Sequence, residues 1–189
     1  MSRQNFETCY IEMRIAVDFA AESLACWESV SQVQHRDWEN DSPALQSYLA
    51  RASLLTLVIE LYKVLETRTD THNFYQLVEY AHQEGIISDP DTWRDIIENT
   101  LKPTWAKIKS LRHKFYAHLD DKKSPKQLIL EANFVPNDFR VLLDDYDSFL
   151  RKMAQCLRQK PTPISVKEDS IRAELKTILE ALKARHGSP

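Results

Sequence analysis

The chain contains 189 residues, of which 43% are hydrophobic and 28% are charged, and its formal net charge at pH 7 is -3. A chain of this length fits one domain that buries roughly 70% of its unfolded surface, and this composition excludes disordered and fibrous proteins. The two glycines are too few for a glycine-rich phosphate loop or a dinucleotide fingerprint, and they argue against a β architecture with many turns.

The cysteines and the apolar runs indicate a cytoplasmic protein. Cys9, Cys26 and Cys156 are odd in number and lie within apolar helical patterns, which favours buried reduced thiols over disulfides. No apolar run approaches the roughly 20 residues of a membrane span. The N-terminus lacks the apolar core of a signal peptide. We therefore expect neither export nor insertion into a membrane.

Apolar residues at alternating intervals of three and four predict two long N-terminal helices. The first helix carries Phe6, Tyr10, Met13, Val17, Ala20, Leu24 and Trp27. The second begins at the capping sequence 40–43, in which Pro43 suits the first helical turn. Its apolar positions are Leu45, Tyr48, Ala52, Leu55, Ile59 and Tyr62. Sustained seams of this kind pack against a neighbouring long helix.

Shorter helices are expected in the middle of the chain. Residues 73–84 form one helix, which Gly85 ends. Residues 88–90 open another helix with a capping side chain before a proline. Pro103 should either kink this helix or mark a restart. A further helix then runs from Trp105 towards His118.

The last third of the chain contains a connection, a long helix and a C-terminal segment. Residues 122–136 read as a connection, with the apolar stretch 128–130 against the core. Asn137 or Asp138 caps the next helix. Its apolar positions are Phe139, Leu142, Tyr146, Phe149, Met153 and Leu157. Residues 159–165 are a linker, and residues 166–189 form a last helix and tail, in which Ile171, Leu175, Ile178 and Leu182 are apolar. We expect an all-α, up-and-down helical bundle of residues 1–158 with this additional helix.

Basic residues gather in one segment of the chain. Between residues 102 and 126 there are eight Lys and Arg against two Asp, a local balance of +6 that leaves -9 for the remainder. Such a patch is expected of a protein that contacts a phosphate backbone. A solvated helix face gives the same pattern, so the charge alone does not decide between the two.

Arg112 and His118 in this segment are the smallest set of residues that could catalyse phosphodiester cleavage. An arginine is permanently charged and suits phosphate, and a histidine transfers a proton near neutral pH. On an ideal helix the two residues are about 120° apart around the axis and about 9 Å apart along it, so they do not share one face. Either the helix loosens before His118, or the arginine bends round, or a second copy of the chain completes the site.

The residue sequence of this segment resembles the motif of a known family. It reads Arg112-His113-Lys114-Phe115-Tyr116-Ala117-His118-Leu119-Asp120. An Arg, four to six residues and then a His is the signature of the HEPN domain ribonucleases, and the full wording is similar to their abortive-infection AbiU-like branch. That branch has Arg-Asn-Lys, two variable residues, Ala-His, one variable residue and Asp, so His113 stands where an Asn is usual. The resemblance covers roughly residues 1–158 and implies a bundle of HEPN type.

The resemblance implies a metal-independent endoribonuclease of a bacterial defence or toxin-antitoxin type, without a cofactor. His118 would be the general acid or base, and Arg112 would stabilise charge on the phosphate. RNA would be the substrate, two copies would form a homodimer that pairs their motifs, and an antitoxin protein would be a further partner. The residues expected to bind RNA or to support the catalytic pair are Lys109, His113, Lys114, Tyr116 and Asp120.

Two other interpretations follow from the residues. A helical module that binds RNA, a nucleotide or a partner protein without cleaving anything would carry the same basic segment. Glu79 and His82 have the Glu-x-x-His form of carboxylate-bridged di-iron bundles, but such a site needs two of these pairs and the sequence has no second one. The other histidines form no set with ligand spacing, so we expect no metal.

Overall fold

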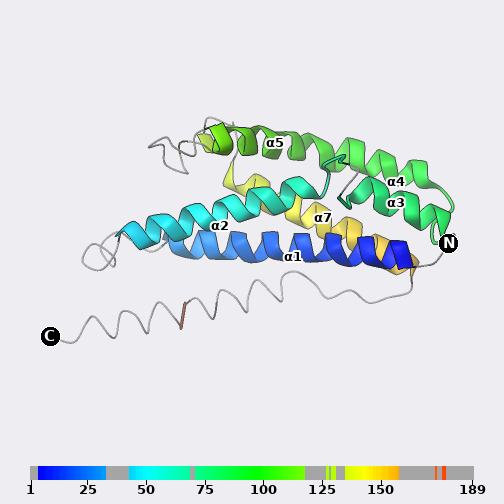
Figure 1. The fold of residues 1–189 in the computed structure, drawn as a ribbon, viewed down its shortest axis with the longest axis horizontal. Helices are drawn as coiled ribbons and strands as arrows, with labels where there is room; N and C mark the ends of the chain where they lie inside the picture. The colour runs from blue at the N-terminus through cyan, green and yellow to red at the C-terminus, as the bar shows by residue number, and fades with distance from the viewer. Residues whose placement is uncertain are drawn as a thin grey trace.

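The computed structural model describes residues 4–32, 43–68, 71–117, 127, 129–130, 135–157, 173 and 176–177. Within this part of the chain every regular element is helical, which confirms the all-α class (Figure 1). The elements in chain order are α1 (Gln4–Gln32), α2 (Pro43–Lys63), α3 (Phe74–Gln83), α4 (Pro90–Ile96), η2 (Ile97–Leu101), α5 (Lys102–Ala117) and α7 (Pro136–Cys156).

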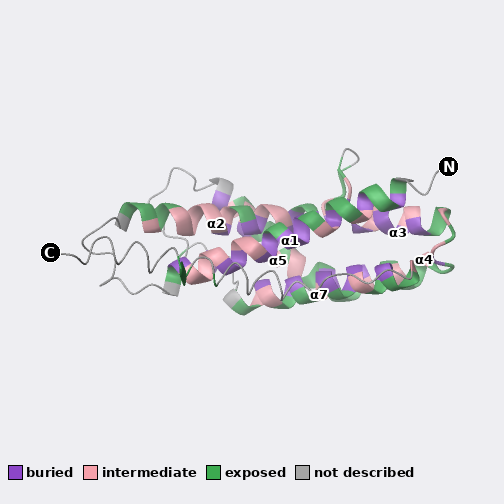
Figure 2. Cartoon of the chain, turned by 90° about the horizontal axis from the view of Figure 1, so that it is seen from below, coloured by how far each residue is buried: buried purple, intermediate pink, exposed green. Residues whose placement is uncertain are grey.

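The two long N-terminal helices lie side by side, as their seams predict (Figure 1). They are antiparallel, since Gln46 near the start of α2 donates to the carbonyl of Val30 near the end of α1 over 3.0 Å. On another side α1 meets α7, to which it is joined by an ion pair of 2.6 Å between Arg14 and Asp147. The arrangement is an up-and-down bundle, in which buried and exposed residues alternate along the helices (Figure 2) and the buried ones are almost all apolar.

An aromatic cluster joins the shorter helices to α7. The ring of Phe74 at the start of α3 stacks on Phe149 at 4.5 Å, and it meets the edge of Tyr146 at 5.2 Å. Trp93 of α4 contacts Phe149 from a third direction, with 5.3 Å between ring centroids. Phe74, Tyr146 and Phe149 are almost completely buried. Because three helices contribute to one cluster, its packing fixes the position of α3 and α4 on the bundle.

The predicted end of α3 at Gly85 and the predicted cap of α4 are confirmed, and α3 also has a cap at its start. Asn73 accepts a hydrogen bond of 3.0 Å from the backbone N–H of Gln76, which satisfies one of the free amides at the helix start. Gly85 follows α3 with φ of +71°, a conformation that favours glycine. Asp89 caps α4 in the same way as Asn73, through the amides of Asp91 and Thr92.

Pro103 neither breaks the chain's helical run nor restarts it after a loop. The run continues from α4 into α5 through the π-helical turn η2, in which the N–H of Lys102 donates to the carbonyl of Ile97. A proline cannot donate to the carbonyl four residues earlier, and its ring crowds that carbonyl. The wider π turn just before the proline accommodates both effects. The helical run is thus continuous through Pro103, and the alternative that the proline kinks it stays a prediction.

The start of α7 differs from the prediction. The helix begins at Pro136, and the residue before it is Val135 rather than Asn137 or Asp138. Asp138 lies in the first turn, where its carboxylate accepts a hydrogen bond of 2.9 Å from the backbone N–H of Val135. The aspartate thus satisfies an amide from inside the helix, as the acidic member of a capping box does.

Part of the predicted connection 122–136 is helical. Gln127, Ile129 and Leu130 have helical backbone, which contradicts the assignment of this stretch to a connection. Ile129 is buried in the core as expected, but Leu130 is 66% exposed. The prediction relied on Pro125 and Pro136, which interrupt helices, and so missed the short helical part between them. The linker 159–165 lies outside the described residues, and so does the segment 166–189 apart from residues 173, 176 and 177.

Two expectations from composition need correction. The cysteines are free, but only Cys9 is buried, Cys26 is half-buried and Cys156 is exposed. The stretch Ala44–Lys63 of α2 is long and apolar enough to cross a membrane by length and composition, contrary to the expectation that no run approaches that length. One such helix is weak support for a membrane span, because core helices of globular proteins meet the same criterion.

Candidate active site on helix α5

The buried face of α5 determines where Arg112 lies. Ile108, Leu111 and Phe115 are buried at intervals of three and four, and they anchor α5 on the bundle beside α2. Arg112 is four residues beyond Ile108, so it projects at the margin of this face, where it is half-buried. The same apolar stripe that forms the helix therefore directs the arginine towards α2.

Tyr62, near the end of α2, receives Arg112. The guanidinium carbon lies 4.1 Å from the centre of the tyrosine ring, a distance typical of a strong cation–π contact. Trp105 stacks on the same ring at 5.4 Å, and its indole N–H donates to the backbone carbonyl of Tyr62 over 3.0 Å. Trp105 and Arg112 are two helical turns apart on one face of α5. We call these three residues the Tyr62 cluster.

An unperturbed tyrosine is already neutral at pH 7, and the surroundings of Tyr62 raise its pKa further. Burial raises the pKa of Tyr62, the negative charge of Glu66 raises it further, and Arg112 opposes these two effects. The ring is therefore a phenol at neutral pH, and its π face attracts the guanidinium. This contact with the ring restrains the arginine and leaves its charge intact.

The other predicted site residues are described unequally. Lys109 is exposed, and its ammonium lies 5.8 Å from the ring of Trp105. His113 is exposed and Lys114 is half-buried, both on α5. The backbone of Tyr116 belongs to the last turn of α5, but its side chain lies outside the described structure. His118 and Asp120 follow α5 and also lie outside it.

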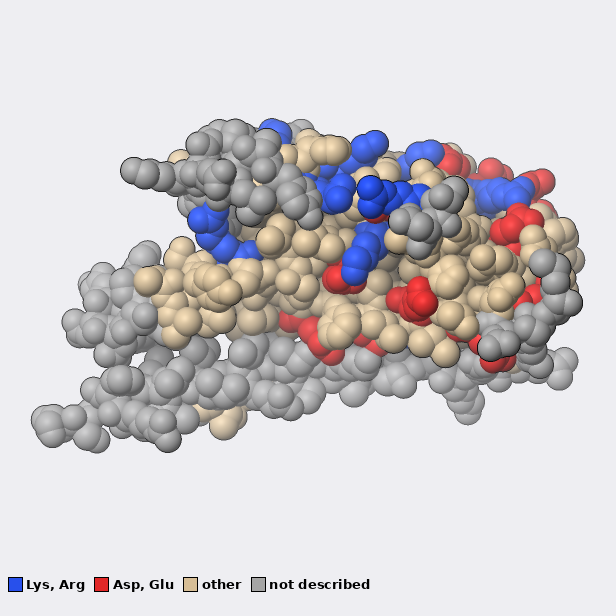
Figure 3. Space-filling view, in the orientation of Figure 1, with Lys and Arg blue, Asp and Glu red and all other residues tan. Residues whose placement is uncertain are grey.

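Two lysines of the basic segment are neutralised by partners outside that segment. Lys107 forms an ion pair of 3.2 Å with Asp138 of α7, and Lys102 forms one of 2.6 Å with Glu98. The charge count over residues 102–126 left out these two carboxylates. Glu98 lies one turn before the segment, and Asp138 is near it only in the fold. Basic side chains nonetheless gather along the edge of the molecule formed by α5 (Figure 3).

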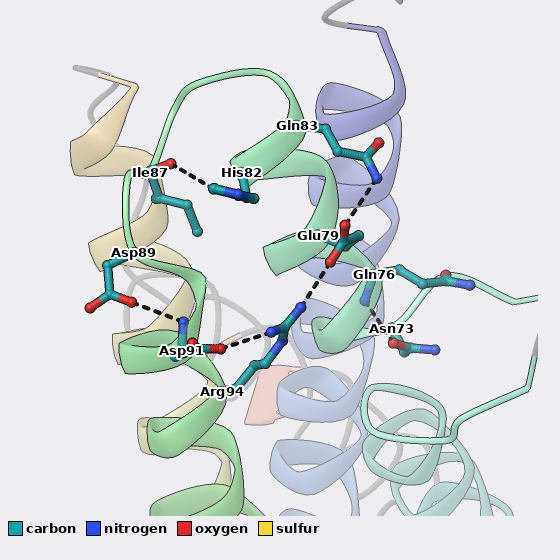
Figure 4. Close-up of polar contacts among 9 residues, drawn as sticks. All are labelled: Asn73, Gln76, Glu79, His82, Gln83, Ile87, Asp89, Asp91 and Arg94. Atoms are coloured by element: carbon teal, nitrogen blue, oxygen red, sulfur yellow. Dashed lines mark hydrogen bonds and ion pairs between the residues drawn. The ribbon is translucent and has the colours of Figure 1, made fainter.

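Glu79 and His82 do not face each other. Glu79 accepts hydrogen bonds from Arg94 at 2.9 Å and from Gln83 at 3.0 Å, and His82 is 3.4 Å from the carbonyl of Ile87 (Figure 4). The glutamate thus ties α3 to α4, and the exposed His82 lies at the turn between them. Within the described residues, no three His, Cys, Asp or Glu side chains come together as metal ligands.

A comparison with protein families identifies the chain. The model of the HEPN family described as AbiU2 matches residues 3–178. The protein belongs to the AbiU2 family of HEPN domains. This family relates it to abortive infection. No curated protein and no solved structure matches the chain significantly. The match runs past residue 158 and includes much of the C-terminal segment of this HEPN protein.

The sequence did not reveal Tyr62 as a site residue. Its apolar spacing in α2 marked it only as a core position, and in the fold it is indeed 8% exposed. Trp105 was likewise counted only as part of the apolar stripe of α5. The signal that could have revealed Tyr62 was the pair Trp105 and Arg112, seven positions apart on one face of a helix. An aromatic ring from another helix can pack against both of them.

A double-mutant cycle tests whether Tyr62 holds Arg112. We expect Tyr62→Leu and Arg112→Met to be coupled by about 1 kcal/mol in the free energy of unfolding, as for a partly buried cation–π pair. The free energies would be measured by urea denaturation of the two single variants and the double variant. His113→Ala, at the exposed neighbour of Arg112, should show no coupling to Tyr62→Leu. Equal, additive effects in both cycles would mean that the ring does not hold the arginine.

Proposed function

We propose that this HEPN protein is a cytoplasmic, metal-independent endoribonuclease of a bacterial defence or toxin-antitoxin type. The observation that carries the proposal is the fixed position of Arg112 against Tyr62, in the last two turns of a helix that leads into His118. Membership of the AbiU2 family supports the same assignment.

The proposed reaction uses the ribose 2'-hydroxyl of the RNA as the nucleophile. The 2'-oxygen forms a bond to the adjacent phosphorus, and the bond from phosphorus to the 5'-oxygen breaks. His118 either accepts the proton of the 2'-hydroxyl or donates one to the leaving 5'-oxygen. Arg112 donates to the phosphate oxygens, on which negative charge increases in the transition state. The products are a 2',3'-cyclic phosphate and a 5'-hydroxyl.

The Tyr62 cluster contributes to this reaction through geometry. A free arginine side chain loses rotamer freedom when it binds phosphate, at a cost of up to about 2 kcal/mol. Stacking on Tyr62 restricts Arg112 before the substrate arrives, so less freedom remains to be lost in the transition state. Lys109 and Lys114 on the same helix would contact the RNA backbone, and His113, Tyr116 and Asp120 would support the catalytic pair.

Replacing the two catalytic residues should separate cleavage from folding. His118→Ala should lower the rate by on the order of a hundredfold or more, the usual contribution of a general acid or base. Arg112→Lys should recover little of what Arg112→Ala loses, because an ammonium does not reproduce the guanidinium fork. The rates would be measured on a labelled RNA, with Lys102→Ala as the matched control, since Lys102 is paired with Glu98 at the far end of α5.

The products and conditions of the same assay test the mechanism. Cleavage should persist in excess chelator, leave a 2',3'-cyclic phosphate and spare DNA, because DNA lacks the attacking hydroxyl. Products with a 5'-phosphate, or a His118→Ala protein with full activity, would contradict the mechanism. RNA binding without cleavage by the wild-type protein would instead support the alternative of a non-catalytic binding module.

We further propose that the site is shared between two copies of the chain. Arg112 lies beside Tyr62 of its own chain, and an ideal helix would place His118 about 120° away from it around the axis. A homodimer that pairs two motif helices across a two-fold axis brings the arginine of one copy towards the histidine of the other. Such a site is incomplete in a single copy.

Mixing two inactive variants tests the shared site. Arg112→Ala and His118→Ala proteins, unfolded together and refolded, form dimers of which about half are mixed, and each mixed dimer has one complete site if the residues come from different copies. Activity should therefore return to about a quarter of the wild-type value. The separate variants, refolded alone, are the controls. A mixture as inactive as its components would place both residues in one chain.

A further inference from the structure

α1 carries an apolar stripe on the side away from the core. Ile11, Ile15 and Phe19 are 55%, 47% and 52% exposed, and they follow one another at intervals of four residues. The core face of the same helix, which includes Val17 and Leu24, is fully buried. Three large apolar side chains in a row at helical spacing form a continuous surface, which is typical of a binding site. We call these three residues the α1 stripe.

A cavity of about 550 Å³ adjoins the α1 stripe. Ile15 and Phe19 form part of its wall, and the other side is lined by residues near the end of α2 and on α3, among them Lys63 and Tyr80. A helix bound along the stripe could therefore place a large side chain in this cavity. The surface is shaped as a groove rather than as a flat patch.

We propose that residues 166–185 of the same chain bind the α1 stripe as an amphipathic helix. The apolar positions of this segment, Ile171, Leu175, Ile178 and Leu182, are spaced by three and four residues. Three residues between them are described: Ala173, Lys176 and Thr177 are helical and exposed. On a helix these three lie at least about 120° from the centre of the apolar seam, which leaves the seam free to face the bundle.

The chain can reach the α1 stripe from the end of α7. α7 runs antiparallel to α1, because Arg14 pairs with Asp147 while Glu28 pairs with Arg140, and it ends near the first residues of α1 (Figure 1). The residues 158–165 span up to roughly 26 Å, more than the helix diameter of about 10–12 Å. The seam between residues 171 and 182 would be about 16 Å long, comparable to the roughly 12 Å between residues 11 and 19.

Charge also favours this pairing. α1 carries five acidic residues against one basic residue, and Glu7, Glu12 and Glu22 flank the stripe. The segment 166–185 carries five basic residues against four acidic ones, a net charge of +1, and its Arg172 and Lys183 lie on one side of the seam. Opposite charges at the margins of two helices set their partner and orientation. A tethered segment also has an effective concentration near the millimolar range, which favours it over a second copy.

Amide hydrogen exchange of the full-length protein tests the contact. We expect the amides of residues 166–185 to exchange at least about tenfold more slowly than in an unstructured peptide, since an isolated helix of this length is only marginally stable in water. Phe19→Asp should return them to the unprotected rate while the amides of α1 and α7 remain protected. Tyr48→Asp is the matched control, because Tyr48 is an exposed apolar residue of α2, 68% exposed.

The outcomes distinguish this contact from others. Protection that disappears in Phe19→Asp, persists in Tyr48→Asp and does not change over a hundredfold range of protein concentration supports the proposal. Unprotected amides in the wild type, or protection that survives Phe19→Asp, would overturn it. Protection that depends on concentration would assign the α1 stripe to a second copy and would also overturn it. None of these results depends on RNA cleavage.

Discussion

The ring of Tyr62 connects the end of α2 to the face of α5 that carries the candidate catalytic arginine. Trp105 packs on this ring and bonds to its backbone carbonyl, and Arg112 lies over its π face at 4.1 Å. The arrangement depends on burial of Ile108 and Leu111, which hold α5 at this distance from α2. The chemistry proposed for the site therefore rests on ordinary core packing, which brings the guanidinium of Arg112 over the ring of Tyr62.

Contacts elsewhere in the bundle also fix the position of α5. The π turn before Pro103 lets one helical run continue from α4 into α5, so the motif helix is anchored at its start by the packing of α4 against α7. Lys107 and Asp138 tie the middle of α5 to the start of α7. These contacts restrain α5 along its length and leave the edge with Lys109 and His113 exposed.

Local signals in the sequence predicted the helices well because they are set by neighbouring residues. Gly85 and Asp89 act through backbone groups within a few positions, and their roles were predicted correctly. The start of α7 was misplaced because Asp138 accepts from the amide of Val135 from within the first turn. An aspartate in this role cannot be distinguished by sequence alone from one that caps the helix from outside.

The candidate site was only partly predictable. The spacing of Arg112 and His118 and the residues around them indicated the family. The match of the family model to residues 3–178 confirms it. The role of Tyr62 could not be seen, because its partner is 50 positions away and the tyrosine fits an apolar seam equally well. The basic segment was overestimated for a similar reason: the carboxylate of Asp138 that neutralises Lys107 is distant in sequence.

The most direct measurement is a crystal structure of the protein with a short RNA that carries a 2'-O-methyl group at the cleavage position. The modified RNA lacks the attacking hydroxyl and should bind without reacting. The account predicts that the guanidinium of Arg112 donates to the phosphate beside the modified ribose while still stacked on Tyr62, with His118 of the partner subunit within hydrogen-bond distance of the 2'- or 5'-oxygen. RNA bound away from α5, or a phosphate that Arg112 does not contact, would contradict it.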